Sequence, residues 1–515
     1  MLNYWWVSRP KRKLNSIPEV LSAFSMISLD QEWRGQRNIH LMFEDSLEKN
    51  YLKREGERRD QSGSGARTYQ AWIESLGLIF VQESTSKIKL TLAGEAIMEG
   101  QPPVSILKNQ VLRYQFPSSY SIKRNVNVSS RFRIRPFRFL LRLLNETGVD
   151  FLTQEEIAKI IIVEATDESD KCFNYIVNRI IEFRNSGDAC LDKDFDTLYG
   201  PGKGAINPDR RFNHLLDISN TLVNWIEYTQ LVKRNERGEI RILDDKLDEV
   251  RSIISINPPF IDRQENHEYY QRKYGLDPKH YKDTRNLSLS QTITAKLILE
   301  MQIKREFLSE ALRSPISSIT INLSEKISNK IGVETNVIYA ILQELYPFGA
   351  IGAFMSEYFE MAFKGRDEAT EFEHATAEIF KEVFKFQTRR IGSNKLNPDI
   401  YILSKTDNFI GIIDNKAYSK YSISNDHRNR MIHNYIQTYK KDKHPLAFFS
   451  YIAGGFGSNI NAQIQSIYDE TSVHGSAISV SNVIRLVERY NQKPYSHAEI
   501  RSLFSSDRQI ILSDI

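Results

Sequence analysis

One stretch of this chain, residues 397–418, narrows what its C-terminal part can fold into. It reads NPDIYILSKTDNFIGIIDNKAY: a Pro-Asp pair, a polar turn, and an apolar run that ends in Asp414-Asn415-Lys416. Side chains alternate between faces in a β-strand, so Asp414 and Lys416 point to one face and Asn415 to the other. Asp399 lies fifteen positions before Asp414, about the length of a β-hairpin. The spacing therefore predicts that Asp399 returns to the sheet edge that carries Asp414 and Lys416.

Two carboxylates and an ammonium at one sheet edge have the composition of a metal-dependent hydrolytic site. Carboxylate oxygens are the ligands that Mg²⁺ prefers, and a lysine beside them can act as a general base or as a charge stabiliser. Pro-Asp and Asp-x-Lys pairs also occur by chance, so an exposed turn followed by a charged strand end explains the stretch equally well by itself. The whole pattern is typical of the PD-(D/E)xK nucleases.

Length and composition indicate a multidomain globular protein. The chain of 515 residues, 41% of them hydrophobic and 26% charged, is too long for one ordinary core and predicts roughly three to four domains. No segment approaches ~18 uninterrupted apolar residues, and the N-terminus places aromatics before its basic run, the reverse of a signal peptide. Cys172 and Cys190 form neither a metal spacing nor a disulfide framework. We expect a cytoplasmic protein without a membrane partner.

The charge of the chain is unevenly distributed. The net charge is only +4, but residues 101–150 contain nine Lys and Arg against two acids, and residues 151–200 contain five against eleven. A basic block inside a nearly neutral chain indicates a face that binds a polyanion. A solvated surface whose acids lie elsewhere would have the same composition.

Residues 53–92 have the order of a winged helix-turn-helix. A polar, basic loop (residues 53–67) precedes a helical segment (68–76) and two short β-like runs (78–81 and 87–92). Such modules place a helix in the major groove of DNA and the wing near the backbone. Helix-turn-strand segments are common, so this order alone is a weak indication.

A partial repeat strengthens the winged-helix interpretation. Residues 69–81 read YQAWIESLGLIFV and residues 222–234 read LVNWIEYTQLVKR, with Trp-Ile-Glu at the same offset in both and an exit into a predicted wing, residues 240–243 in the second copy. Two degenerate copies predict tandem DNA-reading modules. Two unrelated amphipathic helices that share three residues remain the alternative.

The predicted DNA contacts are basic residues that alternate with aromatic or apolar ones. In residues 131–138 arginines alternate with Phe and Ile, so one strand face can be buried while the other lays guanidinium groups along phosphates. The N-terminal arm WWVSRPKRKL and the loop 53–67 supply further cations. The predicted DNA-binding residues are Arg9, Lys11, Arg12, Arg58, Arg59, Arg67, Arg113, Lys123, Arg124, Arg131, Arg133 and Arg135.

Two further segments precede the stretch at residues 397–418. Residues 256–365 read as helices in which we find no chemistry, and we interpret them as a spacer. Residues 368–386, EATEFEHATAEIFKEVFKF, predict a helix with one apolar stripe. Glu373 lies off that stripe and could reach the metal edge; a solvated helix face is the alternative.

Several motifs in fixed order resemble the FokI-type cleavage domain of type IIS restriction endonucleases. They are FEHATAEIFKEVFKF, RRIGSNKLNPD, FIGIIDNKAYS, FFSYIAGGFGSNINAQIQSI and GSAISVSNVIRLV, from about residue 371 to the C-terminus. In the N-terminal half WWVSRPKRKL, VLRYQFPS, IIEFRNS and NWIEYTQLVKR resemble the recognition region of AlwI-type endonucleases. Together the two resemblances cover most of the chain.

The resemblance implies an active site and its cofactor. Asp399, Asp414 and Lys416 match the catalytic triad of the family, and Glu373 matches a helix acid near the metal. Asp399 and Asp414 would hold Mg²⁺, with Mn²⁺ as an acceptable substitute, and Lys416 would act on the attacking water or on the phosphate charge. Cleavage by water would leave a 5′-phosphate.

The chain departs from the family in one helix. The FokI-type domain uses an opposite-charge pair across a transient dimer, and the matching helix here, residues 428–441, places Arg430 and Asn434 at those positions. That salt bridge does not carry over. Dimerisation through other contacts, dimerisation only on DNA, and nicking by a monomer are all compatible with this helix.

Together these patterns predict a multidomain protein of mixed α+β and α/β class. We expect a winged-helix-like recognition module with a basic arm (residues 1–134), a second module (135–255), the helical spacer (256–365) and a mixed-sheet PD-(D/E)xK endonuclease domain (366–515). The predicted activity is that of a type IIS restriction endonuclease on double-stranded DNA, acting as a transient homodimer or with a second subunit, beside a cognate DNA methyltransferase in a bacterial-type system. The alternatives are a strand-specific nicking endonuclease and a non-catalytic winged-helix DNA-binding protein.

Overall fold

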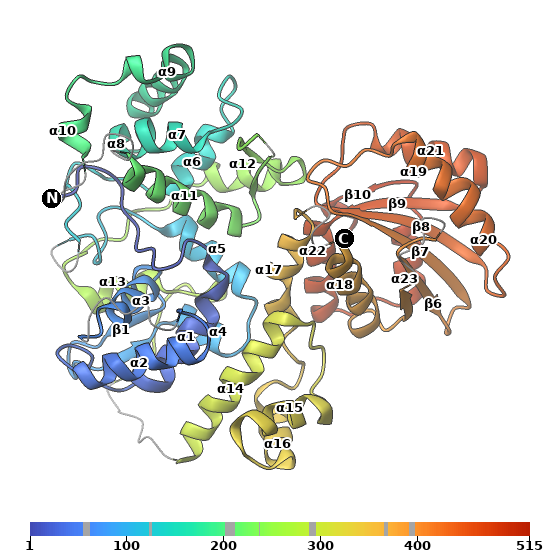
Figure 1. The fold of residues 1–515 in the computed structure, drawn as a ribbon, viewed down its shortest axis with the longest axis horizontal. Helices are drawn as coiled ribbons and strands as arrows, with labels where there is room; N and C mark the ends of the chain where they lie inside the picture. The colour runs from blue at the N-terminus through green and yellow to red at the C-terminus, as the bar shows by residue number, and fades with distance from the viewer. Residues whose placement is uncertain are drawn as a thin grey trace. The chain divides into compact units, whose positions relative to one another are not determined.

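The computed structural model divides the chain into two compact units. It describes residues 1–54, 62–122, 126–200, 212–235, 237–287, 295–364, 369–390 and 397–515. Met1–Ser309 and Ile321–Leu345 form unit 1, and Glu310–Thr320 and Tyr346–Ile515 form unit 2. Unit 1 is mostly helical with short strands, whereas unit 2 is built around a mixed sheet (Figure 1), which confirms the predicted mixed fold class. The finer division at residues 134, 255 and 365 stays a prediction.

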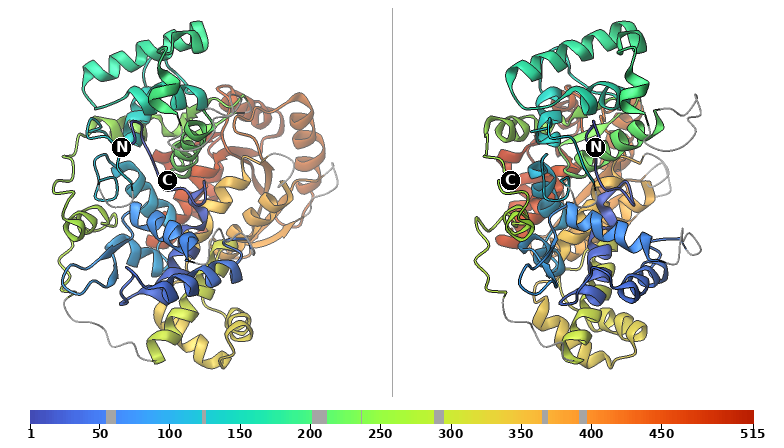
Figure 2. Two further views of the ribbon diagram at one scale, coloured as in Figure 1. Left: turned by 60° about the vertical axis from the view of Figure 1, so that its left-hand side comes forward. Right: turned by 90° about the vertical axis from the view of Figure 1, so that its left-hand side faces the viewer.

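Short helices dominate unit 1, and α9 lies at its periphery (Figures 1 and 2). The elements of unit 1 are η1 (Leu14–Ser16), α1 (Ile17–Ser28), α2 (Arg37–Lys49), α3 (Ser64–Ser75), β1 (Ile79–Val81), β2 (Ile88–Leu90), α4 (Leu92–Met98), α5 (Pro103–Arg113), α6 (Pro136–Leu144), α7 (Gln154–Glu156), η2 (Ile157–Ile161), α8 (Ile162–Glu164), α9 (Asp170–Ser186), η3 (Gly187–Cys190), α10 (Phe195–Tyr199), α11 (Asn213–Tyr228), β3 (Val232–Arg234), β4 (Ile240–Ile242), η5 (Asp244–Lys246), α12 (Leu247–Ser255), α13 (His267–Tyr274), α15 (Ile321–Ile331) and α16 (Thr335–Leu345). Helix α14 (Ala295–Arg313) contains the boundary between the units.

Two segments of unit 1 have the predicted order of a helix followed by a hairpin. Helix α3 precedes the antiparallel pair β1–β2, and α11 precedes the antiparallel pair β3–β4. Trp72 and Trp225, the tryptophans of the repeated Trp-Ile-Glu, are both fully buried. One hydrophobic cluster contains both tryptophans, together with residues as far apart as Tyr4 and Tyr274. The two helix–hairpin segments therefore share a single core.

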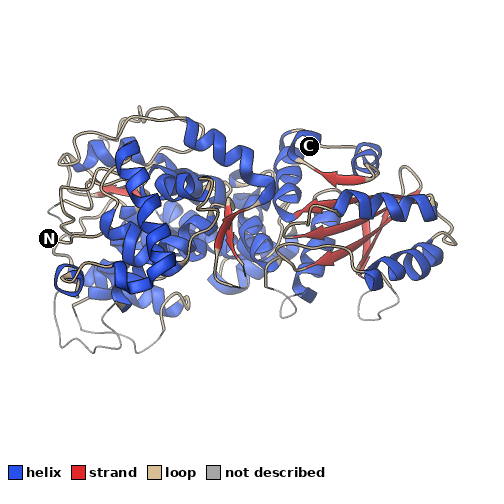
Figure 3. Cartoon of the chain, turned by 90° about the horizontal axis from the view of Figure 1, so that it is seen from above, coloured by secondary structure: helices blue, strands red, loops and turns tan. Residues whose placement is uncertain are grey.

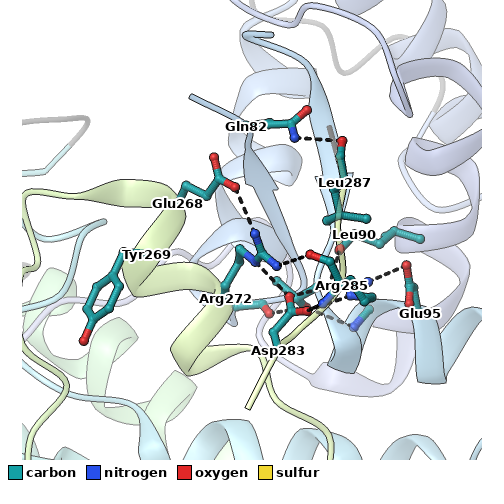
Figure 4. Close-up of polar contacts among 12 residues, drawn as sticks. Gln82, Leu90, Glu95, Glu268, Tyr269, Arg272, Asp283, Arg285 and Leu287 are labelled. Carbon is teal, nitrogen blue, oxygen red and sulfur yellow. Dashed lines mark hydrogen bonds and ion pairs between the residues drawn. The ribbon is translucent and has the colours of Figure 1, made fainter. Parts of the chain in front are cut away.

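Residues 266–287, which we call the strap, pack against the first helix–hairpin segment. The backbone N–H of Val81 donates to Nε2 of His267, 186 positions later, at 3.2 Å. The side chain of Gln82 donates to the carbonyl of Leu287 at 2.8 Å (Figure 4), and the N–H of Ala93 donates to the carbonyl of Gly275 at 2.9 Å. These bonds attach a distant piece of chain to β1 and α4.

The elements of unit 2 are α17 (Ile351–Met361), α18 (Ala369–Glu382), β5 (Gln387–Arg390), β6 (Ile400–Ser404), β7 (Phe409–Lys416), α19 (Asn425–Asn429), η7 (Arg430–Ile436), α20 (Gln437–Tyr439), β8 (Leu446–Ala453), α21 (Ile460–Thr471), β9 (His474–Ser479), α22 (Val480–Gln492), α23 (His497–Phe504), β10 (Arg508–Ile510) and η8 (Leu512–Asp514). The sheet has the order β10-β9-β8-β7-β6-β5. Strands β5, β6 and β7 pair antiparallel, and β7 to β10 pair parallel.

Helices lie on both faces of this sheet (Figure 3). On one face Ile412 packs in a cluster with Met431 and Ile464, so η7 and α21 cover it, and on the other face α18 contacts β7. A parallel strand between two helical layers is apolar on both sides. This is why the run from Phe409 to Ile413 is apolar without alternation. Among the described residues no helix is both long and apolar enough to cross a membrane.

Candidate active site

The β6–β7 hairpin brings the two predicted carboxylates together. Ile400 pairs with Ile413, so Asp399, one residue before β6, falls opposite Asp414 near the end of β7. Asp399 Oδ2 accepts the backbone N–H of Asn415 at 2.7 Å. Lys416 Nζ lies 2.6 Å from Asp414 Oδ2. The three residues predicted at one sheet edge therefore converge.

The electrostatics of the site indicate a shortage of positive charge. Burial and the neighbouring carboxylate of Asp414 raise the pKa of Asp399 well above its usual range. Burial alone would lower the pKa of Lys416, but the carboxylates of Asp414 and Asp399 outweigh it and raise that pKa. One ammonium does not offset the buried carboxylate of Asp414 and the half-buried carboxylate of Asp399 together. A further cation would be favoured here.

Glu373 approaches the same site from α18. Its side chain is half-buried, and its Oε2 atom lies 3.7 Å from Nη2 of Arg390. Burial raises the pKa of Glu373, Arg390 lowers it, and Asp414 raises it further. Asn415, on the opposite face of β7 from Asp414, donates its amide to the Phe372 carbonyl at 3.1 Å. This hydrogen bond holds the helix that carries Glu373 against the catalytic strand.

The residues of this site fit a divalent metal ion. Asp399 and Asp414 offer two carboxylates, and hard oxygen ligands of this kind suit Mg²⁺. The repulsion that raises the pKa of Asp399 is what a dication between the two groups would relieve. Within the described residues no group of three or more His, Cys, Asp or Glu side chains is gathered as a metal cage. A metal here would complete its coordination with water or substrate oxygens.

Two residues near the site were not predicted from the sequence. Tyr421 is buried, and its hydroxyl lies 2.8 Å from Nδ1 of His427. Tyr421 interacts electrostatically with Asp414, and His427 interacts with both Lys416 and Asp414. A single Tyr or His without characteristic spacing gives no signal in the sequence.

Six of the predicted DNA-binding residues lie on or near the surface of unit 1. Arg12, Arg67, Arg131 and Arg133 are exposed, and Arg9 and Lys11 are half-buried; Arg12 pairs with Asp217 at 2.7 Å. Arg58, Arg59, Lys123 and Arg124 lie outside the described residues.

The other two predicted DNA contacts are engaged inside unit 1. Arg113 Nη1 donates to the Tyr274 carbonyl at 3.1 Å, within the strap. Arg135 is 3% exposed, and its Nε atom donates to Glu168 Oε1 at 2.8 Å. Its Nη1 atom donates to the Pro258 carbonyl at 2.6 Å, so all three nitrogens of this guanidinium have partners within the chain. The structure gives both arginines a packing role.

Two sequence models of known protein families match the chain. The model of the FokI cleavage domain matches residues 332–511, which include the β6–β7 hairpin. The model of the AlwI restriction endonuclease matches residues 74–197 of unit 1. No curated protein sequence matches the chain.

Solved structures of restriction endonucleases align with long parts of the chain at low similarity. The structure of restriction endonuclease FokI is 14% identical, with a TM-score of 0.29, over 99% of this chain and 100% of that one. FokI bound to DNA is 13% identical, with a TM-score of 0.28, over 95% and 89%. The BpuJ1 endonuclease binding domain, in complex with pyrene- and phenanthrene-modified DNA, is 15% identical, with a TM-score of 0.36, over 52% and 96%.

Proposed function

We propose that this chain, a type IIS restriction endonuclease by its two matching regions, binds a short asymmetric duplex site and cuts the DNA at a fixed distance outside it. The observation that carries the proposal is the opposed pair Asp399 and Asp414 with Lys416 beside it, inside the region that matches the FokI cleavage domain. The reaction is hydrolysis of a phosphodiester bond that leaves a 5′-phosphate.

Each residue of the site has a part in this chemistry. Asp399 and Asp414 would hold Mg²⁺, or Mn²⁺ in its place, which when bound polarises the scissile phosphate and acidifies a water. Lys416, held by Asp414, orients the attacking water or places positive charge beside the phosphate. Glu373 adds negative charge on the side of α18, and Asn415 fixes that helix to β7.

Unit 1 would supply recognition. Arg9, Lys11, Arg12, Arg67, Arg131 and Arg133 remain in the proposed DNA-binding set because they are exposed or half-buried, although Nη2 of Arg131 donates to the carbonyls of Asn3 and Val163. Arg113 is left out because both its Nη1 and Nη2 atoms donate to carbonyls of the strap, and Arg135 is left out because it is buried. Arg58, Arg59, Lys123 and Arg124 remain in the set on their sequence alone. A cognate DNA methyltransferase is the expected partner, because an endonuclease of this kind requires that the host's own sites be protected.

Strand nicking by a monomer is the second candidate activity. Arg430, at the position where the family places its dimer salt bridge, pairs with Asp426 of its own helix. A residue already paired within the subunit contributes less to a dimer interface. Transient dimerisation on DNA through other contacts would instead give double-strand cuts.

The test is incubation of the purified protein with plasmid DNA and Mg²⁺, followed by run-off sequencing of the ends. Cuts at a fixed offset from one short sequence would support the proposal. Cuts in one strand only would identify a nicking enzyme. No cutting in Mg²⁺ or Mn²⁺, with Asp414→Ala indistinguishable from the wild type, would refute the proposal.

A further inference from the structure

We propose that His427, oriented by Tyr421, donates a hydrogen bond to a phosphate of the cleaved strand beside the one that is hydrolysed. This inference rests on the proposed endonuclease function and assigns a DNA contact within the cleavage unit, outside the Asp399–Asp414–Lys416 group. His427 is the group that touches DNA; Tyr421 is a positioning residue.

We assign the hydrogen bond between the two side chains to the tautomer in which the Tyr421 hydroxyl donates to Nδ1 of His427. Burial and the nearby Asp414 carboxylate raise the pKa of Tyr421, so its hydroxyl stays protonated and can donate to Nδ1 of His427 over 2.8 Å. Burial and the ammonium of Lys416 lower the pKa of His427, so the ring is neutral at neutral pH. A neutral ring that accepts at Nδ1 carries its hydrogen on Nε2. In the assigned tautomer His427 presents an N–H donor at Nε2.

A glycine run holds Tyr421 in place. The N–H of Tyr421 donates to the Gly455 carbonyl, and the N–H of Gly457 donates to the Tyr421 carbonyl, both at 2.8 Å. A Cβ atom on Gly455 would lie 2.5 Å from the Ser419 carbonyl, and one on Gly457 would lie 2.4 Å from Oγ of Ser422. At Gly455, where the added Cβ would meet a backbone oxygen, a larger residue would require the backbone to shift. The AGGFG motif after β8 thus locks the loop that carries Tyr421.

The position of His427 favours a phosphate as its acceptor. The ring of its partner Tyr421 lies 5.6 Å from that of Tyr451, and Tyr451 pairs with Asp414 between β8 and β7. His427 therefore lies near the proposed cleavage site, and its side chain is only half-buried. Most protein hydrogen bonds to DNA go to phosphate and sugar oxygens, and these contacts set the register of the strand. The ring is also followed by η7, a π-helical segment of a kind often found at functional sites.

Methylphosphonate scanning on a duplex that contains the mapped cut position tests the contact. Each phosphate flanking the cut is replaced in turn by a neutral methylphosphonate, and single-turnover rates are measured in Mg²⁺. One flanking substitution should slow the wild type about 10- to 100-fold, the range for loss of a hydrogen bond to a charged group, and should not slow His427→Ala further. His427→Gln, which keeps an N–H donor, should recover part of the rate.

Two further variants separate orientation from folding. Tyr421→Phe keeps the ring and removes the hydroxyl, so it should slow cleavage. Like His427→Ala, it should not be slowed further by the sensitive methylphosphonate. The double variant should cleave no more slowly than His427→Ala alone. His433→Ala, an exposed histidine of η7 whose Nε2 atom is 4.0 Å from Glu470, should cleave at the wild-type rate. Equal sensitivity of wild type and His427→Ala to every flanking methylphosphonate, in proteins with matched melting temperatures, would overturn the inference. A wild type that cuts no DNA would refute the proposed function instead.

Discussion

The buried carboxylate of Asp414 forms an ion pair with the ammonium of Lys416. An amide at this position would keep the shape of the side chain and remove its negative charge. We expect Asp414→Asn to slow cleavage on the order of a thousandfold, because the pair that would hold the metal loses one negative charge. Gel-shift affinity for the same DNA should not change, since recognition is assigned to unit 1.

The matched control for Asp414→Asn is Asp407→Asn. Asp407 is exposed in the turn of the same hairpin, so its substitution should leave the cleavage rate at the wild-type value. Loss of DNA binding by Asp414→Asn would contradict the division between cutting and recognition.

Two neighbouring arginines should respond in opposite ways to substitution. Arg135 is buried against Glu168, so Arg135→Ala should lower the free energy of unfolding by about 3 kcal/mol because it leaves the partly buried Glu168 carboxylate and two further acceptors without their donor. Arg133 is exposed, so Arg133→Ala should leave stability unchanged and reduce the slope of log affinity against log salt by about 0.9. Chemical denaturation measures the free energy of unfolding of each variant, and a salt titration of DNA binding measures the slope. An Arg135→Ala variant that is as stable as the wild type but binds DNA more weakly would contradict the packing role of Arg135.

Sequence reasoning at this scale succeeded where the geometry is local. The convergence of Asp399 and Asp414 follows from the period of a strand and the length of one hairpin. The Arg135–Glu168 pair joins residues 33 positions apart, and the Arg113–Tyr274 bond spans 161 positions. Composition cannot distinguish a guanidinium that is engaged inside the fold from one that faces solvent. Tyr421 was missed for a related reason, because its place depends on a loop after β8.

Among the elements, the strap depends on one buried carboxylate. Burial by itself would raise the pKa of Asp283, but hydrogen bonds from Arg285 and Arg272 outweigh it, and the pKa lies well below its usual range (Figure 4). A depressed carboxyl pKa stabilises the fold above the unfolded-state value of about 3.9 and loses that contribution as the pH falls below it.

We therefore expect Asp283→Asn to destabilise unit 1 at neutral pH by about 3 kcal/mol, because three charge-assisted hydrogen bonds, one from Arg272 and two from Arg285, are weakened. Below about pH 4 the difference between variant and wild type should shrink. Thermal unfolding across pH 3 to 7 measures both effects. A constant difference over that range would show that Asp283 is not ionised in the folded protein.

Element order was easier to predict than element detail. The helix–hairpin order of α3 with β1–β2 was predicted from the succession of a helical segment and two β-like runs, and that of α11 with β3–β4 from the repeated Trp-Ile-Glu; the structure has both. The helix expected over residues 428–441 instead contains the π-helical turn η7. Apolar spacing does not separate α from π geometry over two turns, because the difference of one residue per turn falls within the width of the apolar face.

For the molecule as a whole, the shared core of unit 1 sets where the chain can be divided. A fragment of residues 1–134 would lose Trp225 and Tyr274, which lie in the same hydrophobic cluster as Trp72. We expect residues 1–287 to give a cooperative thermal transition by circular dichroism, and residues 1–134 to give none. A folded 1–134 fragment would support the predicted domain boundary at residue 134 and would show that the strap is not needed for folding.

The position of the strap in the chain also has a consequence for synthesis. Translation proceeds at about 5–20 residues per second, so His267 leaves the ribosome roughly 10 to 40 s after Val81, its partner 186 positions earlier. During that interval the β1–β2 hairpin has no strap to cover it, and an uncovered strand edge is a site of aggregation. We therefore expect the yield of folded protein in the cell to depend on the elongation rate and on the chaperones that meet the nascent chain, before any DNA is bound.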